Sequence, residues 1–356
     1  YDAVFASHYH SDHTGLLRFV IPVIPIYMGE TAYKITKSVA DYKGREAGFS
    51  VKSFLEEFVP VTVGDLTVTP IPCDHSAYGA FMFLVSVDEP ADASVGAGAN
   101  INNRKTLLYT ADYRSTGRKD FDILLESLPD VDVLITEGTT LSRGEDFHEP
   151  REQELEDFAV ETMAARSGPA FVYLSAQNVD RIITAYNAAR RTDRRFIMDT
   201  LTDTVARAAG LCLEGAVVSN VFEMHPGVPG IRPGAAEKSD LFAKNDFLLC
   251  VTPQTLPNIE RLNRRISFEN GTLFFGRREK YMLKPVTAAL IALLKARGLI
   301  VPILHTSGHA DSNTIQRLIT AVDPSVIIPV HTENAAWFSR FEDECEVIYE
   351  CRGFEV

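Results

Sequence analysis

The feature that most constrains this chain is a cluster of metal-ligand side chains close to its first residue. Three histidines and Asp12 lie within the six residues 8–13, whose sequence is HYHSDH. The apolar residues 3–6 before them predict a short buried strand, so the cluster is expected in a tight loop at the end of that strand. Imidazole and carboxylate groups suit zinc, manganese and iron. The loop can direct His8 and His10 at one ion and Asp12 and His13 at a second, which predicts a two-metal centre rather than a histidine-rich surface turn.

Three further candidate ligands follow predicted strands later in the chain. His75 comes after residues 66–71, Asp112 after residues 106–110, and His331 after residues 325–330. A single histidine or aspartate at a strand end is more often a cap or a turn former. Their occurrence together with the leading cluster favours metal binding.

The pattern of apolar residues divides the chain into two regions. Short strands are expected before Arg143, at residues 58–62, 66–71, 80–87, 106–110 and 131–136, and a loop without apolar periodicity is expected at residues 88–105. Strands then alternate with helices, which is typical of a parallel sheet with crossover helices. The helices are expected around residues 155–163 and at 179–190, 203–213, 286–297 and 313–322, and the strands at 170–174, 195–198, 299–304 and 325–330. We therefore expect one domain from residues 1–143 and 300–356, with a second inserted at 144–299.

Bulk composition excludes several classes of protein. The net charge of −13 argues against a general nucleic-acid coat protein, although a cleft can be locally basic. The five cysteines form no CxxC pair, which disfavours a disulfide framework and a zinc ribbon and indicates a cytoplasmic compartment. No apolar run has membrane-spanning length. The chain begins at Tyr1, so we expect N-terminal sequence to be missing, and the oligomeric state is not predicted.

The seven candidate ligands resemble, in order, the metal-binding pattern of the metallo-β-lactamase superfamily. The spacing and later motifs are most similar to its β-CASP nuclease branch and to ribonuclease J. The resemblance implies an α/β fold: an αβ/βα sandwich with an inserted α/β cap domain of the β-CASP kind. It also implies that His8, His10 and His75 bind one zinc ion, that Asp12, His13 and His331 bind the other, and that Asp112 bridges them. Mn²⁺ is the alternative metal.

Three motifs carry the resemblance to the nuclease branch. Glu137, after the predicted strand 131–136, resembles the acidic residue of motif A and would orient a neighbouring histidine. His309, in Thr-Ser-Gly-His-Ala, resembles the motif B histidine, which faces the leaving group and can donate a proton to it. His331 stands where RNA-acting members have histidine, which favours RNA as the substrate over DNA. For Glu137 and His309, structural roles in a helix start and a glycine turn are the alternatives.

Substrate-binding residues are expected in and beside the cap. The stretch at residues 174–181 resembles a ribonuclease J segment at a helix start, where backbone N–H groups suit a phosphate, and Ser307 and Gly308 resemble the family's terminal-phosphate pocket. The candidates in the cap stretch are Ser175, Asn178 and Arg181. The stretch from position 260 to 300 contains nine basic residues and only three glutamates, and this excess of positive charge favours a surface that binds a polyanion. For the four arginines at positions 190, 191, 194 and 195, a solvated helix face is the better interpretation.

The resemblance to ribonuclease J is weaker in the cap. The family's glycine-rich stretch late in the cap is replaced by residues 251–257, VTPQTLP, and a later serine-rich segment by residues 274–278, FFGRR. The chain ends soon after His331, so no C-terminal dimerisation domain is expected. These departures concern contacts with the substrate and leave the metal chemistry unchanged.

The sequence therefore predicts a two-zinc phosphodiesterase that cleaves RNA, or single-stranded DNA, with a metal-bridging hydroxide. Asp12 or Asp112 would accept the proton of the water and His309 would protonate the leaving oxygen. Two other functions remain open: a small-molecule ester, lactone or thioester hydrolase of the same fold, and a non-catalytic module of an RNA-processing assembly. The choice between endonuclease and exonuclease action, and the RNA itself, are not predicted.

Overall fold

The computed structural model describes the chain except for residues 89–103, 145–146, 220–241, 243–244, 253–258 and 350–356, and except for the side chains of residues 260 and 261. The described residues form two compact units. Unit 1 comprises Tyr1–Tyr33, Gly48–Glu149 and Gly308–Val356, and unit 2 comprises Lys34–Ala47 and Pro150–Ser307. The predicted domain limits at 143/144 and 299/300 remain a prediction.

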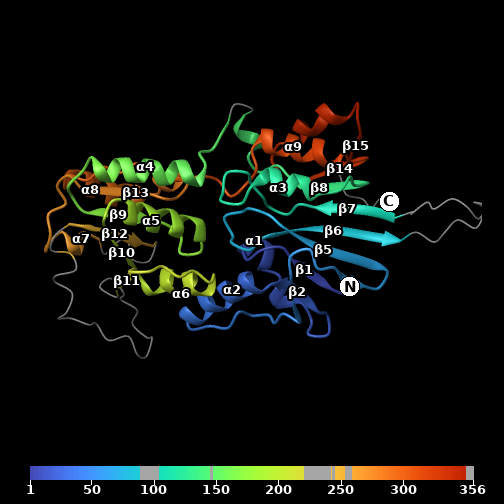
Figure 1. Ribbon diagram of the computed structural model, residues 1–356, viewed down its shortest axis with the longest axis horizontal. Coiled ribbons are helices and arrows are strands. Elements are labelled where there is room, and N and C mark those ends of the chain that lie inside the picture. The colour runs from blue at the N-terminus through green and yellow to red at the C-terminus, as the bar shows by residue number, and fades with distance from the viewer. Residues whose placement is uncertain (89–103, 145–146, 220–241, 243–244, 253–258, 350–356) are drawn as a thin grey trace, which may run out of the picture. The chain divides into compact units, whose positions relative to one another are not determined.

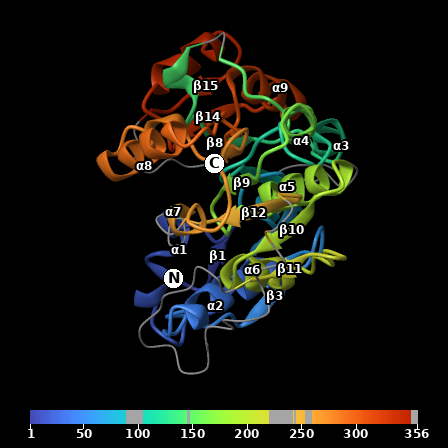
Figure 2. The same ribbon diagram turned by 90° about the vertical axis from the view of Figure 1, so that its left-hand side faces the viewer.

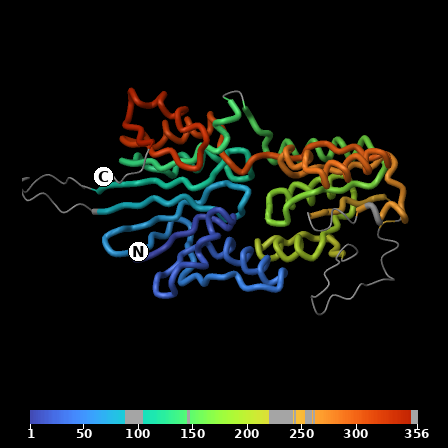
Figure 3. Tube along the Cα trace, turned by 180° about the vertical axis from the view of Figure 1, so that it is seen from behind, coloured from blue at the N-terminus to red at the C-terminus, as the bar shows by residue number. Residues whose placement is uncertain are grey.

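Unit 1 is built on a seven-stranded mixed sheet in the order β15-β14-β8-β7-β6-β5-β4 (Figure 1). Its strands are β4 (Val61–Val63), β5 (Leu66–Pro72), β6 (Phe81–Asp88), β7 (Arg104–Tyr109), β8 (Val133–Glu137), β14 (Val326–Val330) and β15 (Glu346–Val347). Strands β4 to β7 pair antiparallel, whereas β7, β8, β14 and β15 pair parallel. The run from β5 to β8 can be followed as neighbouring traces in Figure 3.

The direction of these strands brings four of their carboxyl ends to one edge of the sheet. Strands β5 and β7 are both antiparallel to β6 and therefore run the same way. Strand β8 pairs parallel with β7, and β14 pairs parallel with β8, so both run in the same direction as β7. Residues that follow β5, β7, β8 and β14 thus meet at a single edge, which is where the candidate metal ligands of the sequence lie.

Each face of the sheet buries a different apolar cluster, because side chains alternate along a strand. In β6, Met82 and Leu84 point to one face, and Phe81, Phe83 and Val85 to the other. The first face is covered by α3 (Phe121–Glu126), α9 (Ser312–Val322) and the 3₁₀ helix Ala335–Phe341.

Helix α9 shows how the sequence specifies its place on the sheet. Asp311 caps its start by accepting a hydrogen bond from the backbone N–H of Thr314 at 2.8 Å. Its buried apolar residues Ile315, Leu318, Ile319 and Val322 recur at helical spacing and join the cluster beneath. The helix ends at Asp323, whose φ of 38° lies in the left-handed region.

The opposite face packs against a small parallel sheet in the order β1-β2-β3. Its strands are β1 (Val4–Ala6), β2 (Ile26–Gly29) and β3 (Ser53–Leu55). Phe5 of β1 stacks on Tyr27 of β2, with ring centroids 4.8 Å apart, and meets Phe83 of β6 edge-on. Helix α1 (Ser11–Thr14) and the 3₁₀ helix Leu17–Phe19 follow β1, and α2 (Glu30–Tyr42) follows β2. The 3₁₀ helix Leu141–Arg143 follows β8.

Unit 2 is a five-stranded parallel sheet in the order β11-β10-β12-β9-β13. The strands are β9 (Ala170–Tyr173), β10 (Arg195–Met198), β11 (Val217–Val218), β12 (Phe247–Val251) and β13 (Thr272–Phe275). The helices are α4 (Glu152–Ala164), α5 (Val179–Arg191), α6 (Thr200–Ala208), α7 (Ile259–Leu262) and α8 (Pro285–Ala296), with a 3₁₀ helix at Glu279–Tyr281. Helices α4 and α5 pack side by side (Figure 2), while α7 and α8 contribute to an apolar cluster with Phe171, Leu249 and Leu273.

Most of the elements expected from the sequence are confirmed, with three differences. Residues 299–304 form only two isolated bridges, at Ile300 and Ile303, instead of a strand. The strand expected at 58–62 begins at Val61, because Phe58 has a left-handed φ of 60°. Helix α6 begins at Thr200, three residues early, because Asp199 caps it, and it ends at Ala208, five residues before the expected end. Of the loop expected at 88–105, Asp88 lies in β6, Arg104 and Lys105 lie in β7, and the rest lies outside the described residues.

No described helix has both the length and the apolar character needed to cross a membrane.

Candidate metal centre

The first four candidate ligands come from the segment that links β1 to α1. His8 lies in the loop after β1, and His10 directly precedes α1. The carbonyl oxygen of His10 accepts hydrogen bonds from the backbone N–H groups of His13 and Thr14, at 3.1 and 3.0 Å. This tight turn places Asp12 and His13 in α1 itself, and His8 and His13 both approach the Oδ2 atom of Asp112.

The other candidate ligands lie at the common edge of the large sheet. His75 follows β5, Asp112 follows β7 and His331 follows β14. Ala111 and His331 have left-handed φ angles of 49° and 50°. Such conformations cost free energy in residues other than glycine and persist where the surrounding structure requires them. Here they accompany side chains that are turned toward the site.

The seven candidate ligands form two groups that share Asp112. The first contains His8, His10, His75 and Asp112; the second contains Asp12, His13, Asp112 and His331. In each group, one ligand atom from every residue lies within 4.8 Å of the others. The structure therefore brings together all seven residues that the sequence singled out.

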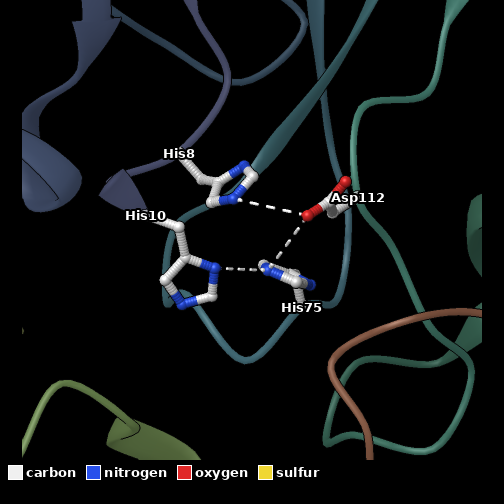
Figure 4. Close-up of side chains that lie close together, drawn as sticks. All are labelled: His8, His10, His75 and Asp112. Atoms are coloured by element: carbon white, nitrogen blue, oxygen red, sulfur yellow. Dashed lines mark hydrogen bonds and ion pairs between the residues drawn. The ribbon is translucent and has the colours of Figure 1, made fainter. Parts of the chain in front are cut away.

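Figure 4 shows the first group. The Nε2 atom of His8 is 3.7 Å from the Oδ2 atom of Asp112, and the Nε2 atom of His75 is 3.9 Å from the same oxygen. The Nε2 atom of His75 and the Nδ1 atom of His10 are 3.0 Å apart. Two nitrogens that each lie about 2.0–2.1 Å from a tetrahedral zinc ion are about 3.3 Å apart, so this spacing suits a shared ion.

The second group is more exposed. The Nε2 atom of His13 lies 3.2 Å from the Oδ2 atom of Asp112, and the Nδ1 atom of His331 lies 3.5 Å from its Oδ1 atom. Asp12 is 3.7 Å from the Nε2 atom of His331 and is 60% exposed. Within unit 1, the side chains of this group are therefore more open to solvent than those of the first group.

The donor set fits one or two divalent ions. The Nε2 atom of His8 is buried and has no hydrogen-bond partner among the described residues, and its neighbour at 3.7 Å is the buried Oδ2 atom of Asp112. A buried polar atom left in this way costs free energy, which a bound cation would remove. Imidazole and carboxylate are the ligands that zinc and manganese accept.

The pKa values of the histidines favour metal binding. Burial, followed by the charges of neighbouring histidines, lowers the pKa of His8 to about 2 and that of His75 well below 6.5. Burial also lowers the pKa of His10 to about 4. These three imidazoles are neutral near pH 7, as a metal ligand must be. For His13, burial opposes protonation, but the hydrogen bond to Asp112 and its charge prevail and raise the pKa.

Each of three ligand rings is oriented by a partner, and two of these partners, Ser7 and Thr139, were not singled out by the sequence analysis. Ser7 Oγ lies 3.1 Å from Nδ1 of His8, the carbonyl oxygen of Gly308 contacts Nδ1 of His75, and Thr139 Oγ1 lies 2.7 Å from Nδ1 of His331. A contact at one ring nitrogen fixes the tautomer and aims the other nitrogen. Ser7 and Thr139 are near neighbours in sequence of His8 and Glu137, which is the only signal that the sequence offers for them.

Glu137 and His309 form a contact beside the second group. The Oε2 atom of Glu137 is 3.0 Å from the Nδ1 atom of His309. The carboxylate also accepts hydrogen bonds from the backbone N–H groups of Tyr113 and Thr139, at 3.0 and 3.3 Å. The Nδ1 atom of His309 lies 3.7 Å from Asp112, and these residues with His331 make a third cluster of ligand atoms.

Comparison with known proteins agrees with this geometry. The family described as Beta-lactamase superfamily domain matches residues 1–167, which include six of the seven candidate ligands, all except His331, and also Glu137. The family described as Zn-dependent metallo-hydrolase RNA specificity domain matches residues 294–344, which include His309 and His331. This chain belongs to the metallo-β-lactamase superfamily. The two matches together are the arrangement of a β-CASP-type member of the superfamily.

A solved structure supports the same fold for this superfamily member. It is the crystal structure of a protein of unknown function from Enterococcus faecalis V583, with a TM-score of 0.74 and 21% sequence identity. The match covers 99% of this chain and 80% of the other. The expected metallo-β-lactamase fold is thereby confirmed, and as a member of this superfamily the chain is a metallo-hydrolase.

A buried ion pair links two of the ligand loops of this metallo-β-lactamase domain. The Nε atom of Arg114 is 2.6 Å from the Oδ1 atom of Asp74, and both side chains are almost fully buried. Asp74 adjoins His75, and Arg114 lies two residues after Asp112. The Oδ2 atom of Asp74 also accepts the backbone N–H groups of Arg118 and Lys119, both at 2.8 Å. The pair holds the His75 loop and the Asp112 loop in fixed register.

The candidate substrate residues have contacts within the protein. Asn178 caps α5 by accepting a hydrogen bond from the backbone N–H of Arg181. Arg181 is fully buried and pairs with Glu152 at 3.1 Å. Ser175 follows β9 in unit 2, and Ser307 is buried. Gly308 has its carbonyl oxygen on His75, as described above. The substrate-binding role of all five residues remains a prediction.

The two arginine-rich regions differ in their contacts. Arg191 pairs with Glu156 and Asp157, Arg195 pairs with Asp246, and Arg194 donates to backbone carbonyl oxygens, including that of Gly168 at 3.0 Å. These arginines stabilise unit 2 through internal contacts. In the second region, at positions 260–300, the side chain of Arg261 lies outside the described residues. Residues 253–257 of the altered cap stretch, which precede this region, also lie outside them.

Proposed function

We propose that this chain is a two-metal ribonuclease, which hydrolyses phosphodiester bonds in RNA with two zinc ions, or two manganese ions, as cofactors. The observation that carries the proposal is the position of Asp112 between two histidine-rich groups. A single carboxylate with two oxygens can contact an ion on each side, which is the usual role of a bridging ligand in a two-metal site.

The chain's own residues supply the metal sites. In this proposal, His8, His10 and His75 hold one ion and Asp12, His13 and His331 hold the other, with Asp112 shared. When bound, the two ions lower the pKa of water and offset the negative charge that develops on the phosphate oxygens. The greater exposure of Asp12 and His331 supports the second site as the side from which the substrate enters.

Glu137 and His309 would handle the proton of the leaving group. In the proposal, Nδ1–H of His309 donates a hydrogen bond to Oε2 of Glu137, and the Nε2 atom of the protonated ring gives its proton to the departing ribose oxygen. Because backbone N–H groups hold the Glu137 carboxylate, the ring is presented in one orientation. Asp12, the exposed carboxylate, or Asp112 would accept the proton of the attacking water.

RNA is favoured over a small ester, lactone or thioester by residues 294–344. They match the family described as an RNA specificity domain and contain His309 and His331. Single-stranded DNA is the second substrate to be tested. The five cysteines of the sequence form no CxxC pair, which supports the proposal of a cytoplasmic enzyme. We retain residues 144–299 as the inserted cap domain in this proposal.

The test is cleavage of labelled RNA by the metal-loaded chain. Single-stranded RNAs with 5′-monophosphate, 5′-triphosphate or 5′-hydroxyl ends are incubated with the protein in zinc or manganese, and the products are mapped. We expect cleavage that EDTA abolishes, and the product pattern separates endonuclease from exonuclease action.

The control is the His10→Ala variant, which removes one ligand of the first group. It should lose turnover and bind less zinc by mass spectrometry. Hydrolysis of a lactone or thioester without cleavage of RNA or DNA would instead support the small-molecule alternative. A protein that retains no transition metal after dialysis against zinc would support the non-catalytic alternative.

A further inference from the structure

A cluster of cationic side chains surrounds one tyrosine in unit 2. The guanidinium of Arg277 lies 4.4 Å from the ring centroid of Tyr281, the ammonium of Lys284 lies 4.7 Å from it, and that of Lys280 lies 5.9 Å from it. These distances are within the range of cation–π attraction. We call Arg277, Lys280, Tyr281 and Lys284 the Tyr281 cluster.

The cations of this cluster lack negative partners among the described residues. Arg277, Lys280 and Lys284 take part in no ion pair there, and neither does the adjacent Arg278. This contrasts with Arg181, Arg191, Arg195 and Arg207 of the same unit, each of which pairs with a carboxylate. On a chain with a net charge of −13, this local excess of positive charge is not a consequence of overall composition.

The cluster is held in place by the fold. Arg277 follows β13, and its Nη1 atom donates a hydrogen bond at 3.2 Å to the hydroxyl oxygen of Tyr173 at the end of β9. Tyr281 is partly buried against the apolar core of unit 2. Like charges held this close repel one another in the absence of a ligand. The aromatic ring and the fixed backbone offset part of that cost, so the cations are already arranged when an anion arrives.

Two neighbouring features extend the same surface. Lys284 occupies the N-cap position of the twelve-residue helix α8, so the positive end of the helix dipole adds to the charge of the cluster. Leu283 and Val286 are 78% and 77% exposed, which places apolar side chains beside the cations. Charged groups interleaved with aromatic and apolar ones are typical of surfaces that bind single-stranded nucleic acid, whose phosphates and bases alternate.

We propose that the Tyr281 cluster binds the phosphate backbone of single-stranded RNA at a site separate from the seven candidate metal ligands. Lys280 and Lys284 contact successive phosphates, Arg277 provides a fixed charge and a planar group for a base, and Tyr281 holds the three cations together. This proposal rests on the proposed ribonuclease function, since it supplies that enzyme with a binding site for its substrate in unit 2.

The experiment measures binding and catalysis separately, on the full-length chain. Binding is followed by fluorescence anisotropy with a phosphorothioate oligouridylate of about 20 nucleotides, which resists hydrolysis, over a series of salt concentrations. In the Lys280→Ala/Lys284→Ala variant we expect Kd to rise about tenfold or more. Each lost phosphate contact lowers the slope of log K against log salt by about 0.7, so the double variant should lose about 1.4.

The role of Tyr281 is tested by two substitutions. Tyr281→Phe keeps the ring and should bind like the parent chain, whereas Tyr281→Ala should weaken binding about as much as the double lysine variant. Circular dichroism shows whether Tyr281→Ala remains folded. If it does not, the lysine variant and Tyr281→Phe still decide the proposal.

The matched control is Arg190→Ala. Arg190 is exposed and lies in unit 2, and its guanidinium carbon is 5.8 Å from the ring centroid of Tyr186. The variant therefore removes one charge from a comparable aromatic site. Its Kd should stay within about twofold of the parent value. A double lysine variant with unchanged Kd and salt slope would overturn the proposal, and so would an equal loss in Arg190→Ala.

Hydrolysis of bis(4-nitrophenyl) phosphate separates this proposal from the proposed function. All the variants should hydrolyse this small phosphodiester like the parent chain, because the substitutions leave the metal ligands intact. Loss of RNA binding in the cluster variants without phosphodiesterase activity in any protein would contradict the enzyme function and support the binding site. Full phosphodiesterase activity in the cluster variants, together with unaltered RNA binding, would support the enzyme function and contradict the binding site.

Discussion

Asp112 connects more of the candidate centre than any other side chain. Its two oxygens lie between 3.2 and 3.9 Å from ring nitrogens of five histidines, at positions 8, 13, 75, 309 and 331. Burial alone would raise the pKa of this carboxyl, but the hydrogen bond from His13 and the surrounding histidines lower it below its usual value. Asp112 therefore remains ionised and supplies the negative charge that cations in both groups require.

Glu137 gives the first prediction at this scale. Glu137→Gln keeps the volume of the side chain but removes the charge that faces His309 and one of the two oxygens that accept backbone hydrogen bonds. We expect turnover on RNA to decrease about 10- to 100-fold, as for other residues that orient a catalytic histidine, and the pH profile of kcat to shift. The zinc content, measured by mass spectrometry, should not change.

The exposed Glu126 provides the control, because Glu126→Gln removes a carboxylate of the same unit outside the site. If Glu137→Gln retained full turnover, or lost zinc in proportion to its activity, Glu137 would not be acting through His309.

The buried histidines give a second prediction, for the metal-free protein. His8, His10 and His75 have pKa values below the value of about 6.5 that they take on unfolding. Below pH 6.5 the unfolded chain therefore binds more protons than the folded one, and stability decreases as the pH is lowered. Each such histidine contributes up to about 1.4 kcal/mol per pH unit. The raised pKa of His13 opposes this trend only in part.

Thermal unfolding in EDTA between pH 8 and pH 5 measures this effect. We expect Tm to decrease below about pH 6.5, and the same decrease in a His148→Asn variant, because the His148 side chain is 68% exposed. A Tm that stays constant or increases over this range would show that these histidines are not held neutral by burial.

At the scale of elements, the Asp74–Arg114 pair gives a third prediction. Asp74→Asn leaves the Arg114 guanidinium buried without its counter-ion, which costs about 3 kcal/mol or more. For a unit of this size that corresponds to a decrease in Tm on the order of 10 °C. Zinc affinity should also decrease about tenfold, because the His75 and Asp112 loops lose their common anchor.

A double variant separates the ion pair from packing. Asp74→Leu combined with Arg114→Met removes both charges together and should destabilise the protein less than Asp74→Asn alone. The measurements are differential scanning calorimetry and zinc titration. A larger loss in the double variant would mean that shape, rather than charge, governs this contact.

Sequence periodicity predicted four of the long helices well but did not predict α2, which is as long as α4. Helices α4, α5, α8 and α9 have either caps or apolar residues at helical spacing over three turns, and their ends agree with expectation to within about three residues. The four-residue strands β2 and β13 are too short to show periodicity. Residues 299–304 are as apolar as a strand, yet they contribute only two bridges beside β13. Pairing depends on the neighbour, which the local sequence does not contain.

Some roles of the site residues could likewise be predicted from the sequence, and others could not. The ligand set could be proposed from sequence because it depends on residue types in a recurrent order, from His8 to His331. Asn178 and Arg181 could not be assigned in the same way, because the same asparagine can cap a helix or bind a phosphate. The partner of Arg181, Glu152, is distant in sequence. Gly308 and Thr139 contact ligand rings across large sequence separations that no local pattern marks.

At the scale of the whole molecule, all seven candidate ligands belong to unit 1. This gives a fourth prediction. Removing the metal with EDTA should increase backbone hydrogen exchange at the loops after β1, β5, β7 and β14, since bound ions stabilise the folded state of the residues that hold them. The parallel sheet β9–β13 of unit 2 should keep its protection.

Hydrogen-exchange mass spectrometry with and without saturating zinc provides the measurement. The Asp112→Asn variant is the control, because it should show the increased exchange even in zinc. An equal increase throughout unit 2 would mean that the metal stabilises the chain as a single cooperative body.

The ligands of the second group are far apart in sequence, because Asp12 and His13 precede His331 by more than three hundred residues. During synthesis His8–His13 therefore emerge from the ribosome before His331 and β14, which follow more than three hundred codons later. At about 5–20 residues per second, roughly 20 to 60 seconds pass before the second group has all its ligands. During that interval the early histidines form an incomplete site exposed to any cellular metal ion. If the centre holds two ions as proposed, the second group can therefore be completed only after β14 has paired with β8.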